Sequence, residues 1–276
     1  MSLLVFCVVL LAASLHAVWN AIVKVGADTL LTTILVAASG ALIGLVALPF
    51  VPPVSPAAWP YLGISAVLEI AYYALVAAAY RNTDMSRAYP LMRGAPPLIV
   101  ALVSALALGM GLSLTGWFGI GLVSLGLLSL TLGGAGGNSR GVLFALANAL
   151  VIASYTLVDA FGVRASGSPV GYTMWIYVLT GSPLALWALL RRPDILPYAR
   201  RHWRLGLAGG AGTLVSYGLV LWAMTMAPIA LVAALRETSI LFGTAIAGLI
   251  LREHITRARL MAVLIIAAGA IVLKLA

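Results

Sequence analysis

Hydrophobic residues in this chain form long unbroken runs instead of alternating with polar residues. Polar, proline-rich or glycine-rich breaks separate ten such runs, each about twenty residues long. A helix rises 1.5 Å per residue, so about twenty apolar residues cross a hydrocarbon core about 30 Å thick. The pattern therefore predicts ten membrane-spanning helices, over residues 2–25, 29–49, 58–80, 87–108, 113–131, 140–162, 169–190, 203–226, 228–250 and 257–274.

A glycine-rich stretch in the middle of the chain divides the ten runs into two sets of five. Residues 133–138 predict a flexible linker between a first repeat, 1–132, and a second repeat, 139–276. Five is an odd number of crossings, so the second repeat enters the membrane from the opposite side. The predicted fold is an all-α integral membrane protein of two inverted five-helix repeats, a plan common in secondary transporters.

An internal duplication supports this division. The match is weak in sequence, but it runs without a gap from the third to the fifth predicted helix. A shift of 143 residues lays Arg93 on Arg236, Leu98 on Leu241 and Gly126 on Gly269.

Composition indicates a membrane protein and excludes a soluble one. Hydrophobic residues make up 63% of the 276 residues and charged residues 8%, whereas soluble domains are about 25% charged. The first apolar run lacks a basic stretch before it and is longer than a signal peptide, so it predicts a spanning helix. The single cysteine, Cys7, excludes an intrachain disulfide and a cysteine-based metal site.

Basic residues gather in alternate loops. The net charge of +9 suggests nucleic-acid binding, but these residues lie in short loops where topology requires them, so we expect no nucleic-acid partner. Loops after even-numbered helices, together with the two ends, carry only Arg164 and Lys274. The positive-inside rule then places both termini outside the cytoplasm. Loops after odd-numbered helices carry twelve basic residues, Lys24, Arg81, Arg87, Arg140, Arg191, Arg192, Arg200, Arg201, Arg204, Arg252, Arg257 and Arg259.

Two arginines lie inside apolar runs, where each costs about 2.5–3.5 kcal/mol on insertion scales. Arg93 is followed by Pro96 and Pro97, which lack N–H donors and free the carbonyls around Met92 and Arg93. A helix broken beside a charge predicts a cavity, so Arg93 is the first candidate for substrate contact. The alternative is an arginine that extends to the interface near Arg87.

Carboxylates accompany these arginines. Glu237 follows Arg236, and an ion pair from Glu237 to Arg93 across the repeat interface is sterically reasonable, either as a structural contact or as part of a substrate site. Glu69 lies in the middle of the third predicted helix and is a candidate proton carrier, because a carboxyl in an apolar surrounding can bind a proton. The charges of Arg93, Arg236, Glu69 and Glu237 sum to zero.

Polar and aromatic side chains complete the candidate site. His16 and Asn20 are four residues apart and share one face of the first predicted helix with Trp19. Each is as consistent with packing as with a pocket, and a single histidine without a second ligand predicts no metal. Asn148 and Asp159 are ambiguous, with Asp159 expected near a helix end. The tyrosines best placed to line the site are Tyr73, Tyr89, Tyr155 and Tyr217.

Four stretches resemble the EamA family of the drug/metabolite transporter superfamily. They are HAVWNAIVK at 16–24, YPLMRG at 89–94, ALRETS at 234–239 and LREH at 251–254. The family pattern has an acidic residue after the fourth helix, where this chain has Met110, whereas Glu253 keeps it after the ninth. The resemblance implies ten spans, with helices 1, 3, 4, 6, 8 and 9 around a central cavity and helices 5 and 10 outside. It also implies termini on the inner side, so both orientations stay open.

These observations predict a secondary transporter of the bacterial cytoplasmic membrane. We expect it to move a small polar or zwitterionic, amino-acid-like metabolite by alternating access, in export or exchange, with proton coupling through Glu69 or His16 as one energy source. We expect no cofactor and no catalysis, and a monomer or homodimer in the bilayer. The alternative is a membrane-embedded enzyme or an assembly subunit that acts on a lipid-linked substrate.

Overall fold

The structure, a computed structural model, describes residues 1–133 and 138–276, and the elements of this part are all helical. Nine of its helices are long and apolar enough to cross a membrane, and α5 (Leu114–Ser129) is a shorter apolar helix of 16 residues. The ninth span consists of α9 (Ile229–Arg236), α10 (Ser239–Ala245) and the π-helix η4 (Ile246–Ile250). The other long helices are α1 (Leu3–Val25), α2 (Thr29–Ala47), α3 (Trp59–Asn82), α4 (Met85–Leu106), α6 (Ser139–Ser166), α7 (Pro169–Arg191), α8 (Ile195–Met226) and α11 (Arg257–Leu275).

Short polar side chains begin most of these helices. Ser113 and Ser168 accept hydrogen bonds from backbone N–H groups in the first turns of α5 and α7, and Thr256 does so for α11. Such caps satisfy N–H groups that the helix itself leaves free. The helices therefore start where an apolar run follows a capping residue. Residues 134–137 of the predicted linker lie outside the described residues.

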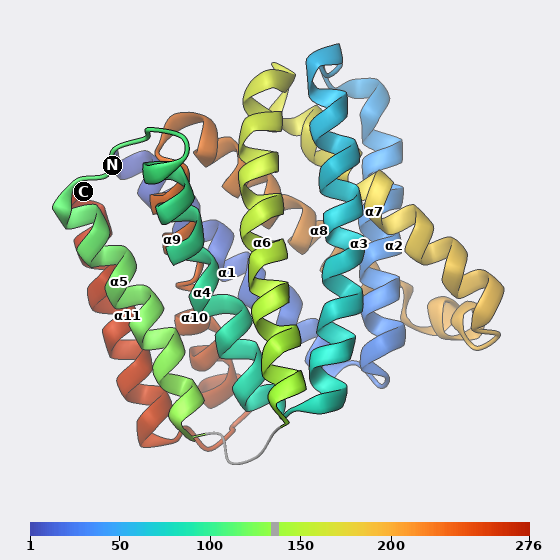
Figure 1. The fold of residues 1–276 in the computed structure, drawn as a ribbon. Coiled ribbons are helices and arrows are strands. Elements are labelled where there is room, and N and C mark those ends of the chain that lie inside the picture. The colour runs from blue at the N-terminus through green and yellow to red at the C-terminus, as the bar shows by residue number, and fades with distance from the viewer. Residues whose placement is uncertain (134–137) are drawn as a thin grey trace.

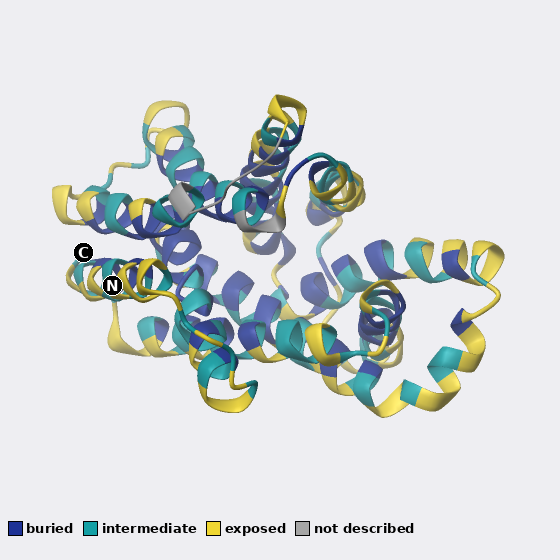
Figure 2. Cartoon of the chain, turned by 90° about the horizontal axis from the view of Figure 1, so that it is seen from below, coloured by how far each residue is buried: buried dark blue, intermediate teal, exposed yellow. Residues whose placement is uncertain are grey.

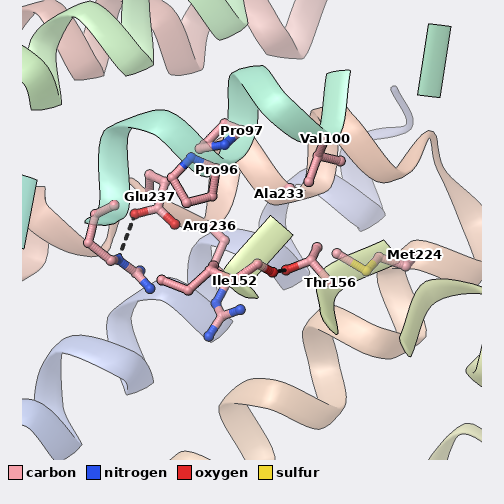
Figure 3. A pocket seen from close by; sticks show the side chains of 10 residues that line it. Pro96, Pro97, Val100, Ile152, Thr156, Met224, Ala233, Arg236 and Glu237 are labelled. Atoms are coloured by element: carbon pink, nitrogen blue, oxygen red, sulfur yellow. Dashed lines mark hydrogen bonds and ion pairs between the residues drawn. The ribbon is translucent and has the colours of Figure 1, made fainter. Parts of the chain in front are cut away.

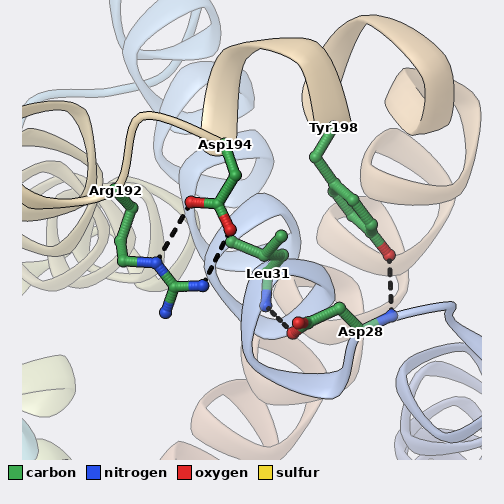
Figure 4. Close-up of polar contacts among 5 residues, drawn as sticks. All are labelled: Asp28, Leu31, Arg192, Asp194 and Tyr198. Atoms are coloured by element: carbon green, nitrogen blue, oxygen red, sulfur yellow. Dashed lines mark hydrogen bonds and ion pairs between the residues drawn. The ribbon is translucent and has the colours of Figure 1, made fainter.

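The connection between α7 and α8 is tied to the start of α2 (Figure 4). Asp28 caps α2 by accepting from the N–H of Leu31 at 2.8 Å, and its own N–H donates to the hydroxyl of Tyr198 at 3.4 Å. Asp194 accepts two hydrogen bonds from Arg192. The expected start of the eighth span at residue 203 agrees with the kink at His202, where the chain bends between a helical segment that begins at Ile195 and the remainder of α8.

The helices form one bundle, with both termini at the same end (Figure 1). Helix pairs far apart in sequence pack along each other, above all α3 with α6, α5 with α11, α2 with α7 and α1 with α8. Buried positions face the middle of the bundle and exposed positions lie on its outside (Figure 2). The outside includes many large apolar side chains, such as Leu11, Leu42 and Phe118, as expected for a surface that faces lipid.

Glycines allow α5 and α11 to pack closely. A Cβ atom on Gly126 would lie 2.7 Å from Cγ1 of Ile266, and one on Gly269 would lie 2.8 Å from Cγ2 of Val123. Either methyl group would force the two helices apart. The matched glycines of the duplication, Gly126 and Gly269, therefore serve the same interface.

The interruption expected beside Arg93 lies on a different helix. α4 is a single helix with Pro90, Pro96 and Pro97 inside it, so these prolines free carbonyl groups without ending the helix. The ninth span, expected to be one helix over 228–250, is instead divided after Arg236.

Candidate functional site

A buried ion pair joins α4 to the segment formed by α9 and α10. Nε of Arg93 lies 2.9 Å from Oε2 of Glu237, and the two side chains are 10% and 7% exposed (Figure 3). The distance is that of an ion pair, and Nη2 of Arg93 has no hydrogen-bond partner among the described residues. Nη2 of Arg93 and Oε2 of Glu237 thus retain hydrogen-bonding capacity that a polar ligand can use. The contact between Glu237 and Arg93 that was sterically reasonable from the sequence is thus present.

A tight turn in the ninth span positions Glu237. The N–H of Glu237 bonds to the carbonyl of Ala234 at 3.1 Å, and the N–H of Thr238 bonds to the carbonyl of Leu235 at 3.0 Å. Both bonds reach three residues back instead of four, as in a 3₁₀ turn. The hydroxyl of Thr238 also donates to the carbonyl of Leu235 at 2.7 Å, which competes with the regular ladder. This turn joins α9, which ends at Arg236, to α10, which begins at Ser239.

Arg93, Arg236 and Glu237 line one small cavity (Figure 3). Its volume is about 10 Å³, which is room for about one water molecule. Nε of Arg236 is buried and has no hydrogen-bond partner among the described residues. A metabolite therefore fits between the arginines only after the helices move apart. The remaining walls are Pro96, Pro97, Val100, Ile152, Thr156, Met224 and Ala233.

A chain of contacts leads from Arg236 to a second buried carboxylate. Cζ of Arg236 lies 5.1 Å from the centroid of the Tyr217 ring, a cation–π contact. The hydroxyl of Tyr217 donates to Oδ2 of Asp159, and the hydroxyl of Tyr172 donates to Oδ1 at 2.9 Å. Asp159 is completely buried. It belongs to the candidate site on this geometry.

Sequence reasoning left Asp159 ambiguous for a physical reason. Its predicted helix ended at residue 162, so the carboxylate was expected near a helix end, whereas α6 continues to Ser166. Its partners Tyr172 and Tyr217 lie on α7 and α8. No residue pattern around Asp159 itself therefore reveals that two hydroxyl groups enclose it.

The polar residues of α1 divide into one that faces the arginines and one that does not. Nε1 of Trp19 donates to Nδ1 of His16 at 3.2 Å, so this imidazole nitrogen acts as an acceptor. His16 lies within electrostatic range of Arg93 and Arg236. Nδ2 of Asn20 instead donates to the carbonyl of His16 at 2.7 Å and is held against its own helix. The structure thus brings His16 and Trp19 to the site more clearly than Asn20.

Glu69 of α3 lies on the same side of the site as Asp159. It is within electrostatic range of Asp159 and Arg236. Tyr155 of α6 is 7% exposed and is within electrostatic range of both Arg236 and Glu69. Tyr73 also lies near Glu69, but it is 38% exposed and stands at the edge.

Tyr89 of α4 lies at the ion pair. Its hydroxyl is within electrostatic range of Arg93, Glu237 and Arg236. Over residues 1–133 and 138–276, no three His, Cys, Asp or Glu side chains gather in a group that could hold a metal ion. The polar cluster is therefore built of guanidinium, carboxylate and hydroxyl groups, which suit a polar organic molecule.

Comparison with known proteins agrees with this architecture. Residues 139–275 match the model of the EamA-like transporter family. No curated protein sequence matches the chain. One solved structure, described as a crystal structure of a protein, is similar with a TM-score of 0.75 at 21% identity, and the similarity covers 99% of this chain and 96% of that chain. At that identity the likeness concerns the fold.

The matched family consists of transporters of the drug/metabolite transporter superfamily. The nine long apolar helices and the family match together identify a multi-pass membrane protein. By this match, the second half of the chain, residues 139–275, belongs to the EamA-like transporter family.

Proposed function

We propose that the chain is a secondary transporter that moves a small polar or zwitterionic, amino-acid-like metabolite by alternating access. The observation that carries the proposal is the Arg93–Glu237 ion pair, which is buried in a cavity too small for a metabolite and yet retains unused hydrogen-bonding groups. Such groups are costly inside a protein unless a ligand uses them in another state of the cycle. A site that must open to bind is what alternating access requires.

Charge complementarity favours an amino-acid-like substrate. A guanidinium binds a carboxylate through two parallel hydrogen bonds, and Arg93 and Arg236 both lie at the cavity. Glu237 and Glu69 offer carboxylates to an amine, and Tyr89 and Tyr155 add hydroxyl groups. A molecule that carries both charges at short separation fits this set, with exchange or a proton gradient as the energy source.

Helix packing supports two inverted five-helix repeats, 1–132 and 139–276. The shorter helix α5 then counts as the fifth span and brings the total to ten. If the spans are numbered from one to ten and each is exchanged with the span five places away, the α3–α6 interface becomes the α8–α1 interface. In the same way, the α4–α6 interface becomes the interface of the ninth span with α1. Each pair consists of extensive interfaces. The pairs α2–α7 and α5–α11 each map onto themselves. An approximate two-fold relation of this kind allows the two halves to exchange roles as the site opens to either side.

Loop charge supports an orientation with both termini outside the cytoplasm of a bacterial cell. Both termini lie at one end of the bundle (Figure 1), opposite the end at which α1 and α3 finish. Lys24 and Arg81 lie in the last turns of these two helices. Alkaline phosphatase fused after Ala276 should then be active, and the same enzyme inserted after Arg192 should be inactive. The reverse result would place the basic loops outside. We propose a monomer or homodimer in the bilayer, without a nucleic-acid partner.

A transport assay tests the function directly. The purified protein is reconstituted in liposomes and given radiolabelled amino acids, sugars and organic cations, one at a time. We expect saturable uptake of at least one zwitterionic or polar compound, and exchange with the same compound trapped inside. Thermal stabilisation only by lipids, with no uptake of any soluble compound, would instead favour a membrane-embedded enzyme or an assembly subunit acting on a lipid-linked substrate.

A further inference from the structure

The charged groups of the site, of which Arg93, Glu237 and Asp159 are buried, do not balance once Asp159 is included. Two guanidinium groups, Arg93 and Arg236, face three carboxyl groups, Glu69, Glu237 and Asp159. The imidazole of His16 does not change this count, because its Nδ1 accepts a hydrogen bond from Trp19 and the ring is then neutral with its proton on Nε2. One negative charge remains without a counter-charge. An unpaired charge in the middle of a membrane-spanning helix is strongly unfavourable, so a group of this kind takes up a proton or another cation.

Hydrogen bonding indicates which carboxyl group is ionised. Glu237 is ion-paired with Arg93. Asp159 accepts a hydroxyl hydrogen bond at each of its two oxygens, from Tyr172 and Tyr217. Hydrogen bonds donated to a carboxylate favour its charged form. Asp159 and Glu237 are therefore the two ionised carboxylates that Arg93 and Arg236 offset.

Glu69 is the remaining carboxyl group. It has no ion pair within 4.0 Å among the described residues. Its helix, α3, packs along α6, which carries Asp159, in one of the most extensive interfaces of the bundle. The hydroxyl of Ser65, one turn before Glu69, is completely buried beside Asp159 without a regular hydrogen bond. Titratable and charged groups that face Glu69 are Asp159 and Tyr155 from α6, Arg236 from α9, Tyr72 and Tyr73 from α3, Tyr172 and Tyr177 from α7, and Tyr217 from α8.

We propose that Glu69 and Asp159 form a two-carboxyl site that holds one proton in the closed protein, on Glu69, with Arg236 linking this site to the substrate cavity. This inference rests on the proposed transport function for its role, though not for its chemistry. A hydronium ion from the open side protonates a Glu69 oxygen and leaves as water. Release reverses this step. No oxidant, reductant or further reactant is needed.

The charge count sets a rule for coupling. With the proton bound, the site is neutral. A zwitterion brings one charge of each sign, so the count is unchanged and the proton stays in place. A substrate with one net positive charge supplies the missing cation itself and displaces the proton. Glu69 therefore makes the protein a one-for-one proton exchanger for cationic amines. For zwitterions it narrows the proposed energy source to exchange, because their binding leaves the proton in place.

Infrared difference spectroscopy of the full chain tests the site without any substrate. A protonated carboxyl group has a carbonyl stretch that an ionised one lacks. At neutral pH we expect one such band in the wild type and none in Glu69→Gln. The decisive variant is Asp159→Asn: it balances two guanidinium groups against two carboxylates, so Glu69 ionises and the band disappears although Glu69 is intact. Arg236→Met should add a second protonated carboxyl group and roughly double the band.

Matched controls keep the outcomes separable. Glu253→Gln removes an exposed carboxyl group and should leave the band unchanged. A band that persists in Asp159→Asn would mean that burial of Glu69 alone keeps it protonated and would overturn the pairing. Loss of the band on adding Na⁺ at constant pH would reassign the site to a metal cation. If the band follows these expectations but no compound is transported, the proton site stands and the transport proposal fails. If a compound is transported but the wild type shows no band, the transport proposal stands and the proton site fails.

Discussion

α4 and the α9–α10 segment occupy matching places in the two halves and use the same arginine differently. Arg93 faces the carboxylate of Glu237, whereas Arg236 lies over the ring of Tyr217. The residue after each arginine explains the difference. A Cβ atom on Gly94 would lie 3.0 Å from Leu127 of α5, so this glycine serves helix packing, while Glu237 at the same position supplies the counter-charge. The two segments that the shift of 143 residues aligns thus share an arginine and differ in the residue that follows it.

The two segments also differ in how they free backbone groups near the charge. α4 contains Pro96 and Pro97, which lack N–H groups, and yet it stays helical. The ninth span has Ser239 and Ile240 at these positions and divides through a tight turn at Thr238. In α4, carbonyl groups are left free because proline has no N–H group, whereas in the ninth span they are left free because the turn interrupts the helix. A continuous helix and a divided helix therefore line the same cavity.

Replacing each arginine by alanine is the strongest test of this asymmetry. Arg93→Ala should reduce transport of the best substrate by about 150-fold or more, because two charged hydrogen bonds contribute about 3 kcal/mol. Arg236→Ala removes a cation–π contact of about 0.5–2 kcal/mol and should reduce transport by about 2–30-fold. Uptake into liposomes at equal reconstitution measures both, with Arg87→Ala as the control outside the cavity. Equal losses for the two variants would mean that the halves contribute alike.

The buried ion pair gives the next largest effect, on stability. Glu237→Gln leaves Arg93 without a counter-charge and should lower the free energy of unfolding by about 3–5 kcal/mol. Replacing both residues, in Arg93→Met with Glu237→Met, should recover most of this loss while abolishing transport. Thermal unfolding in detergent measures the stability of the wild type, the single variant and the double variant. A double variant as unstable as the single one would show that the two side chains are stabilised by other contacts.

Much of this arrangement follows from sequence, and the exceptions have clear causes. Apolar runs place the long helices because membrane thickness sets their length. The expected entry of the two segments from opposite sides of the membrane made a pair between Arg93 and Glu237 sterically reasonable. The helical turns of α8 before His202 were not predicted, since charged residues surround this segment in the sequence, although its Ile195 belongs to one apolar cluster with Leu31 and Ile34 of α2. The helix break expected at Pro96 and Pro97 of α4 lies instead in the ninth span, after Arg236. Proline keeps a helical φ angle, so packed neighbours can hold α4 straight, whereas the hydroxyl of Thr238 competes for a carbonyl in the ninth span.

Restoring the N–H groups of α4 tests whether its prolines serve the cavity. A proline inside a helix costs up to about 3 kcal/mol, so Pro97→Ala should raise thermal stability by part of that amount. It should also lower transport several-fold, because the carbonyl of Arg93 becomes bonded within the helix. Pro90→Ala is the matched control, since Pro90 lies in the same helix but does not line the cavity. Equal transport by the two variants would assign Pro97 to packing alone.

The far ends of the two segments provide the smallest effect. Glu253 ends the ninth span and pairs with Lys24 of α1 at 2.6 Å, whereas α4 has Met110 at the matching position. The hydrogen bond from Lys24 lowers the pKa of Glu253 below its ordinary value. A lowered pKa means that the pair stabilises the fold above the ordinary pKa of a glutamate, about 4.3, and that this contribution is lost as the pH falls through the lowered value.

Glu253→Gln should therefore lower the melting temperature only slightly at pH 7, and the difference from the wild type should vanish in acid. High salt should remove it as well, because exposed charges are screened. The same titration with Glu237→Gln should show a difference that salt does not remove, since the Arg93–Glu237 pair lies away from water. If both differences responded equally to salt, the site would be open to solvent, and the contrast between a sealed centre and an exposed end would be lost.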